Sequence, residues 1–177
     1  MSAINHRQKR GKPSPSSWPP APTPDGLQYR PATPEDAAAL APRLRASDLD
    51  ELARVSDRLI VDRLLDGIRL SDESWSCLKD GEVIGIIGVG SNGTLGTVWM
   101  LCAPEVEQHP RLMLEHPRAW LSSIEGRYGV LCNAMSEHNT ATIEWLKHLG
   151  FTIGDVCSGF GKPGEVFRLF YRSPSNV

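Results

Sequence analysis

The sequence predicts a single α/β domain, residues 27–177, preceded by an extended arm, residues 1–26. The chain has 177 residues, which is enough for one domain with its own core. Its 40 % hydrophobic and 23 % charged residues are typical of a globular protein. Apolar residues recur with a helical spacing in some segments and alternate in others. Helices and strands are therefore interleaved along one domain.

The arm differs from the rest of the chain in composition. Residues 1–26 contain six prolines, one acid and no aliphatic run, so they cannot bury enough apolar surface to offset the entropy lost on ordering. Proline favours an extended polyproline II conformation there. The segment is either a solvated tail or a docking arm, which charge steers and a tryptophan anchors in a partner's pocket. The candidate partner-binding residues are Arg7, Lys9, Arg10, Lys12 and Trp18.

The domain begins with a strand and then helices. Residues 27–30 predict a short strand, and Thr33 is the expected cap of a helix that has Pro34 in its first turn. A second helix begins at Ser47, because three acids follow that favour the positive end of the helix dipole. A further turn or two of helix is expected to end at Gly67.

Strands dominate the rest of the domain. Three are predicted over residues 74–78, 83–89 and 97–101. Asp80-Gly81 is a strong signal for a hairpin turn between the first two. Residues 105–126 predict a helix that Pro110 and Pro117 break or kink. A strand, a helix ended by Gly150 and two last strands are predicted over residues 128–133, 138–149, 151–156 and 166–171.

The end of the last helix carries a resemblance to a known family. Asn139 lies eleven residues before Gly150 and twelve before Phe151. GNAT acetyltransferases often have an Asn here, a Tyr seven positions later and Gly-Phe at this spacing, and their element order is similar over residues 27–171. The resemblance implies a central twisted mixed sheet of about six to seven strands flanked by helices. Two strings, residues 98–101 and 145–151, more closely resemble a phage subfamily related to the small internal virion protein of T7-like podoviruses.

The resemblance implies three requirements for acetyl transfer, of which this chain keeps one in outline. The family holds the pyrophosphate of acetyl-CoA on amides of a glycine-rich loop after the fourth strand. Here residues 102–111 contain no glycine and two prolines, and Glu105 and Glu107 repel phosphate. The family's tyrosine, a general acid, is replaced by Leu146, which has no proton to donate. We therefore predict no catalytic residue.

The third requirement is a strand end whose backbone polarises the thioester. Residues 100–102 can still form it, and Asn139 either keeps its family role or only caps its helix. Leu101, Cys102 and Asn139 are thus the candidate cofactor-binding residues if acetyl-CoA is bound at all. We predict no cofactor if the chain is an interaction scaffold, and acetyl-CoA if it is an acetyltransferase.

Other classes of site have little support. The glycines of residues 88–93 match a dinucleotide motif, but β-branched residues follow them, which indicates a hairpin. Four scattered cysteines without a C-x-x-C pair indicate reduced core thiols, and His109 and His116 lack a third metal ligand. The net charge of −2 argues against sequence-specific nucleic-acid binding. No apolar run approaches the roughly 20 residues that span a bilayer.

Two hypotheses from different classes follow. In the first, the chain is a phage virion-associated or assembly protein. Its catalytically degenerate GNAT-like domain is then a protein-interaction scaffold, and its arm docks on capsid, portal or tail components. In the second, it is an acetyl-CoA-dependent N-acetyltransferase with an atypical pyrophosphate loop. The expected location is the virion or the host cytoplasm.

Overall fold

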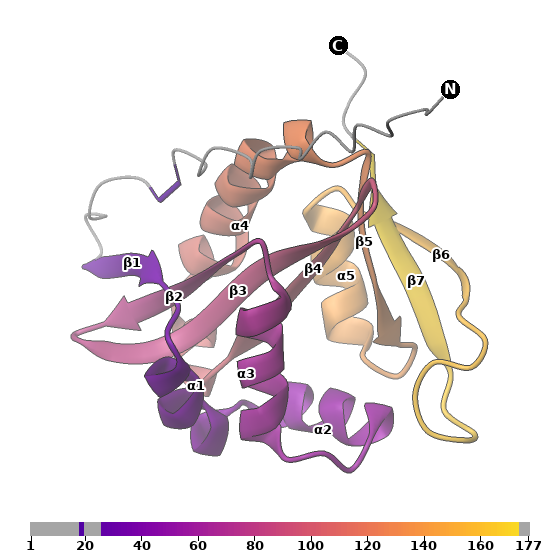
Figure 1. Ribbon diagram of the computed structural model, residues 1–177, viewed down its shortest axis with the longest axis horizontal. Coiled ribbons are helices and arrows are strands. Elements are labelled where there is room, and N and C mark those ends of the chain that lie inside the picture. The colour runs from indigo at the N-terminus through magenta and orange to yellow at the C-terminus, as the bar shows by residue number, and fades with distance from the viewer. Residues whose placement is uncertain (1–17, 20–25, 174–177) are drawn as a thin grey trace, which may run out of the picture.

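The computed structural model describes residues 18–19 and 26–173, which form a seven-stranded mixed sheet flanked by helices, as the sequence predicts (Figure 1). The strand order is β1-β2-β3-β4-β5-β7-β6. Neighbouring strands are antiparallel except β4 and β5, which run parallel. The strands are β1 Leu27–Pro31, β2 Glu73–Lys79, β3 Glu82–Asn92, β4 Leu95–Cys102, β5 Val130–Ser136, β6 Thr152–Val156 and β7 Phe167–Arg172.

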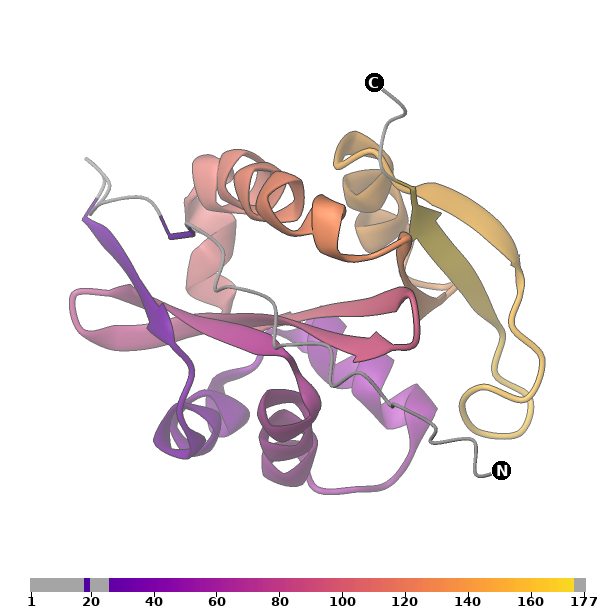
Figure 2. The ribbon, with the colours of Figure 1, turned by 45° about the horizontal axis from the view of Figure 1, so that its top comes forward.

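Helices cover both faces of the sheet. The α-helices of the described residues are α1 Pro34–Leu40, α2 Ala46–Val55, α3 Ile60–Leu70, α4 Pro110–Ile124 and α5 Thr140–His148. Three 3₁₀ helices accompany them: η1 Ala41–Arg43, η2 Pro104–Gln108 and η3 Glu125–Arg127. Helices α1 and α3 lie against one face, and α4 and α5 against the other (Figure 2). No helix in the described part of the chain is long and apolar enough to cross a membrane.

The start of α1 shows how a local sequence signal becomes a long-range contact. Thr33 caps the helix as predicted, and its N–H donates to the Asp36 carboxylate at 2.9 Å in a capping box. The same buried carboxylate accepts two bonds of 2.6 Å from Arg30 and one of 2.7 Å from Ser76. A single side chain therefore ties α1 to β1 and β2.

Glycines and prolines account for the differences from the predicted elements. The prediction that helix ends at Gly67 is wrong: α3 continues to Leu70, and the missing side chain lets the helix approach Trp99 instead. Pro110 does mark a break, between η2 and α4, but Pro117 lies inside a continuous α4. The glycine-rich residues 88–93 form the end of β3 and the turn into β4, which confirms the predicted hairpin.

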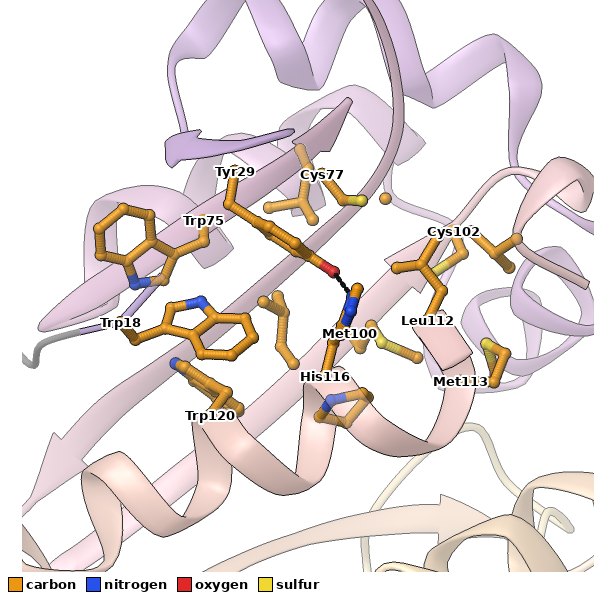
Figure 3. A pocket seen from close by; sticks show the side chains of 15 residues that line it. Trp18, Tyr29, Trp75, Cys77, Met100, Cys102, Leu112, Met113, His116 and Trp120 are labelled. Atoms are coloured by element: carbon orange, nitrogen blue, oxygen red, sulfur yellow. Dashed lines mark hydrogen bonds between the residues drawn. The ribbon is translucent and has the colours of Figure 1, made fainter. Parts of the chain in front are cut away.

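Trp18 packs into the domain of its own chain. Its side chain is only 6 % exposed, and its ring lies 5.2 Å from that of Tyr29 and 6.4 Å from that of His116 (Figure 3). This differs from the expectation that Trp18 inserts into a partner's pocket, because burying this ring on its own core gains the same apolar contact without a partner. The basic candidates of the arm, Arg7, Lys9, Arg10 and Lys12, lie outside the described residues.

Candidate functional site

The two central parallel strands separate soon after they meet. Strands β4 and β5 pair only at Leu95–Thr97 with Val130–Cys132, and beyond these residues they diverge (Figure 1). The side-chain amide of Asn133 bridges the opening by donating to the carbonyl of Val98 at 2.8 Å. The sheet therefore contains a gap between β4 and β5, at its centre.

The backbone of Met100 faces this gap. The N–H of Ala103 donates to the carbonyl of Ile84 in β3 at 2.9 Å. In an antiparallel pair, alternate residues direct both backbone groups toward the neighbour and the others direct them away. Met100 and Cys102 therefore direct their N–H and C=O groups toward the gap, whereas those of Leu101 are directed to β3. Of the two strand residues proposed from sequence, Leu101 and Cys102, only Cys102 directs its backbone N–H and C=O toward the gap.

Cavities lie on both sides of the gap. One of about 300 Å³ opens toward α2 and α3, and a smaller one of about 50 Å³ lies between the sheet, α4 and α5. Six residues line both cavities: Val98, Trp99, Met100, Trp145, Leu146 and Phe170. The two cavities are therefore the two sides of one opening through the sheet.

A parallel central pair that opens in this way identifies the architecture among solved structures. A putative acetyltransferase from Salmonella typhimurium, solved with its cofactor acetyl-CoA, aligns with a TM-score of 0.64 over 85 % of this chain and 95 % of its own, at 17 % identity. A GCN5-related N-acetyltransferase from Kribbella flavida aligns with a TM-score of 0.62 over 86 % of this chain and 100 % of its own, at 15 % identity. The domain has the GNAT fold.

A third structure of the same fold supports this assignment. It is a GNAT phosphinothricin acetyltransferase from Sinorhizobium meliloti in complex with AcCoA, with a TM-score of 0.61, 17 % identity, and coverage of 83 % of this chain and 88 % of its own. No family model and no curated protein matches the sequence. Solved GNAT structures hold acetyl-CoA, so the fold is compatible with that cofactor.

The connector after β4 uses its amides within the protein. The N–H of Cys102 donates to the Asp48 carboxylate at 2.8 Å, and its carbonyl accepts from the N–H of Arg45 at 2.9 Å. The amides of Ala103, Val106 and His109 donate to backbone carbonyls. Pro104 and Pro110 have no N–H. The family resemblance implies that this segment would bind a diphosphate through its amides, but six of the nine positions from Cys102 to Pro110 cannot donate to one.

Charge and burial at this end of β4 are set by three side chains. Arg45 pairs with Asp48 at 3.0 Å, and both side chains are nearly buried. Burial raises the pKa of Asp48, although Arg45 acts in the opposite direction. Burial also raises the pKa of the Cys102 thiol, which therefore stays neutral. All four cysteines are free thiols, but only Cys77 and Cys102 are buried as the predicted core thiols, whereas Cys132 and Cys157 are partly exposed. Glu105, at the start of η2, forms an ion pair with Arg43.

Trp145 and Leu146 close the side of the gap toward α4. Leu146, at the tyrosine position of the GNAT pattern, is 4 % exposed and part of the core. Proline at position 117 leaves the carbonyl of Met113 without its helical N–H donor, and the indole N–H of Trp145 donates to that carbonyl. The indole thus joins α5 to α4, which explains why Pro117 is tolerated within the helix.

Asn139 caps its helix, which was one of its two predicted roles. Its side-chain oxygen accepts from the N–H of Thr142 at 3.2 Å, and its side-chain amide donates to Glu51 at 3.2 Å. Asn139 lines the larger cavity, and the backbone of Cys102 faces the gap. Both are already hydrogen-bonded to a neighbouring side chain, Asn139 to Glu51 and the N–H of Cys102 to Asp48. Among the described residues, no group of three His, Cys, Asp or Glu side chains lies together as a metal site would require.

Sequence reasoning missed four residues of the cavity: Asp48, Glu51, Arg63 and Trp99. Asp48 occurs in the first turn of a helix, where acids are expected for the dipole alone, and Glu51 follows in the next turn of the same helix. Arg63 is one of many charges on an amphipathic helix. The one usable signal was at Trp99, because Gly88 lies directly opposite it in β3, and a side chain there would lie 2.7 Å from the indole.

Proposed function

We propose that this GNAT-fold domain is a protein-interaction module of a phage particle or of its assembly, and that it works without acetyl-CoA. The observation that carries the proposal is the connector after β4. Four of its amides are bonded to Asp48 or to backbone carbonyls and two positions are proline, so a diphosphate bound along the connector would have to break several internal hydrogen bonds.

The groups that acid catalysis needs are also replaced by structural ones. Leu146 cannot protonate a departing thiolate. Trp145 fills the region between α4 and α5 and bonds to the carbonyl of Met113. Breaking that bond to admit a ligand would leave the carbonyl of Met113, which Pro117 deprives of its helical donor, without a partner, at a cost of about 1–3 kcal/mol if it stays buried.

Exposed apolar side chains at one edge of the sheet support a role in protein contacts. Leu169 and Tyr171 point to the same face of β7 and are 41 % and 42 % exposed, whereas Val156 on β6 pairs with Arg168 and points to the other face. Large apolar side chains gathered on a surface are typical of interaction sites. The phage assignment rests on the resemblance of residues 98–101 and 145–151 to the phage subfamily.

Two experiments test this proposal. A thermal-shift titration with millimolar acetyl-CoA should leave the melting temperature unchanged. Binding would be easy to detect, because a ligand at 100 times its Kd adds about 2.7 kcal/mol of stability. A GNAT enzyme known to bind acetyl-CoA serves as the positive control. Mass spectrometry of purified phage particles, or of their assembly intermediates, should find the chain. Its presence only as a free protein in infected cells would contradict the assembly role.

A second candidate is N-acetyl transfer, which one observation favours. The backbone of Met100 faces an open gap, and an N–H directed to such a gap is what polarisation of a bound carbonyl requires. Acetyl-CoA, when bound, would supply the acetyl group. A concentration-dependent thermal shift with acetyl-CoA, together with release of free thiol when amines are added, would select this function over the first.

A further inference from the structure

Helices leave one side of the sheet uncovered over its last strands. On the side of α1 and α3, the apolar core of the described residues includes side chains of β2, β3 and β4 but none of β5, β6 or β7. Helix α2 meets β5 at the end of the strand, where Glu51 accepts from the N–H of Ser136. Figure 2 shows β6 and β7, in yellow, to one side of these helices. This part of the sheet therefore has an open face among the described residues.

Strand pairing identifies the side chains of this open face. Thr97 pairs with Cys132, and Cys132 pairs with Tyr171, so the three form one row across β4, β5 and β7. Trp99, two residues after Thr97, packs against Gly67 of α3, which places the row on the α3 side of the sheet. The open face is defined by six side chains on this side: Leu95, Thr97, Cys132, Ala134, Leu169 and Tyr171.

The open face is exposed and carries no charge. Leu95, Leu169 and Tyr171 are 40 %, 41 % and 42 % exposed. None of the six side chains is ionisable at neutral pH, whereas Arg168 and Arg172 on the other side of β7 both form ion pairs. A sheet face that meets water commonly carries polar side chains. The composition of the open face is instead typical of a surface that another protein covers.

A hollow of about 400 Å³ adjoins the open face, between the end of α3 and strands β3 and β4. Thr97 lines it together with Leu70 and Trp99. The one charged side chain that lines it in the described part of the chain, Asp66, is paired with two arginines. Tyr171 lies in the same row as Thr97, two strands away, which is about 10 Å. One face of the molecule thus presents an exposed aromatic ring and a hollow that can receive it.

We propose that the open face binds a second copy of this chain in a two-fold symmetric dimer, with Tyr171 of each copy in the hollow of the other. In such a dimer residue i contacts residue j and j contacts i, which a ring and a hollow on one face allow. The two sheets then pack face to face. Leu70, which is 66 % exposed and lines the hollow, packs beside the inserted ring.

The lack of charge favours this occupant over two others. The arm of the chain has the basic residues Arg7, Lys9, Arg10 and Lys12, which would need acids on the surface that receives them, and a nucleic acid would need lysines or arginines. Near a two-fold axis, like charges from the two copies would repel each other, and the open face has none. The dimer rests on the interaction role proposed above and names its partner.

Sedimentation of the purified full chain from about 1 µM to 1 mM tests the proposal, and a dimer with a Kd of about 100 µM or tighter is expected. Tyr171→Glu and Leu169→Glu should each weaken the dimer by about tenfold or more, because each buries a charge without a partner. Val156→Glu is the matched control, since Val156 is 48 % exposed on the other side of the sheet. A chain that stays monomeric throughout, or equal effects of the three variants, overturns the proposal.

A mixture of two variants tests the contact between the ring and the hollow. Thr97→Lys places a long side chain in the hollow and should weaken the dimer as Tyr171→Glu does. Mixing the two variants should restore the dimer, because one of the two contacts then joins the introduced glutamate to the introduced lysine, and the other keeps Tyr171 opposite Thr97. A mixture that is no more dimeric than either variant alone overturns this arrangement.

Hydroxyl-radical footprinting of the unaltered chain decides where a variant fails to fold. Oxidation of Tyr171 and Leu70 should fall from dilute to concentrated protein, and oxidation of Val156 should not change. Constant oxidation of Tyr171 in a dimeric sample overturns the proposal. All these measurements use the purified chain without phage components or acetyl-CoA, so a failure of the dimer is distinct from a failure of the proposed function, which the thermal-shift titration and the analysis of particles test.

Discussion

Two glycines, Gly88 and Gly67, leave the space that the indole of Trp99 occupies. A Cβ on Gly88 would lie 2.7 Å from the ring, and one on Gly67 would lie 3.0 Å from it. The ring thus lies between β3 and α3, and its N–H donates to the Ser71 hydroxyl at 2.9 Å. Because Trp99 lines both cavities of the gap, these glycines determine the shape of the candidate site as well as the packing of α3.

Gly88→Ala should therefore destabilise the protein. The added methyl group overlaps a rigid ring held by its own hydrogen bond, and overpacking of this kind costs about 1–3 kcal/mol. Urea unfolding followed by tryptophan fluorescence measures the change. Gly126→Ala is the matched control, since a Cβ there meets nothing within 4 Å. Equal midpoints for the two variants would show that Trp99 moves freely and that Gly88 does not position it.

Because the carboxylate of Asp36 is buried and hydrogen-bonded, we predict that the protein loses stability in acid. Burial raises the pKa of this carboxyl, but the hydrogen bonds from Arg30, Ser76 and Thr33 outweigh it, so its pKa lies below the ordinary 3.8. A lowered folded-state pKa means that the contribution is fully present above pH 3.8 and is lost as the pH falls through the folded value. Asp36→Asn should thus cost about 1.5–3 kcal/mol at pH 7.

The difference between wild type and Asp36→Asn should narrow as the pH is lowered below about 4, because both side chains are then neutral. Thermal unfolding from pH 7 to pH 2.5 measures it. Asp80→Asn changes an exposed acid at a turn and should have no such pH dependence. A difference that stays constant down to the lowest pH would contradict the ionised state of Asp36.

At the scale of elements, residues at the start of helix α2 form hydrogen bonds with the end of β4 at the point where β5 no longer pairs with it. The backbone N–H and C=O of Cys102 bond to Asp48 and Arg45 at the start of α2. These are groups that a parallel strand would otherwise pair. The gap can therefore exist without leaving the end of β4 unsatisfied, and the same bonds keep the amide of Cys102 from binding an anion.

Asp48→Ala should destabilise the protein strongly. It leaves Arg45 buried without a counter-charge and Cys102 with an unpaired N–H, and removing one partner of a buried ion pair costs about 3–5 kcal/mol. Asp48→Asn should cost less, because its side-chain oxygen still accepts from Cys102. Chemical unfolding measures both, with Asp50→Asn on the same helix as the exposed control. If alanine and asparagine cost the same, the bond to Cys102 contributes nothing to stability.

The elements that the sequence predicted correctly are those whose cause is local. Asp80 and Gly81 both have positive φ, 52° and 85°, as the turn they signal demands. Gly150, with φ 86°, ends α5 at the residue expected. The bonds that build the candidate site are long-range instead. Asp48 to Cys102 and Trp145 to Met113 join distant segments, and no periodicity in either segment indicates its partner.

At the scale of the whole molecule, Trp18, the first described residue, packs into a pocket of the domain. Trp18 lies with Tyr29, Trp75 and Trp120 on the side of the sheet that α4 covers, and a cavity of only about 30 Å³ remains there (Figure 3). The hydroxyl of Tyr29 shares a hydrogen bond with His116 of α4 beside it. Trp18 therefore contributes to the core that residues 27–173 build.

This packing changes how an arm deletion must be interpreted. Trp18→Ala should cost about 3–5 kcal/mol, as removal of a buried tryptophan does, and deletion of residues 1–26 should cost at least as much. A failure of the deleted chain in phage assembly would then follow from instability alone. A chain that begins at Trp18 separates the two causes, because it keeps the indole and loses the basic residues Arg7, Lys9, Arg10 and Lys12.

Urea unfolding and a particle-assembly assay on the same three variants decide between stability and docking. If the arm docks through its charges, the chain beginning at Trp18 should unfold at the wild-type midpoint and yet fail to enter particles. If it enters particles normally while Trp18→Ala does not, the arm acts only by supplying its tryptophan to the core. A midpoint for Trp18→Ala equal to that of wild type would instead show that the indole does not stabilise the domain.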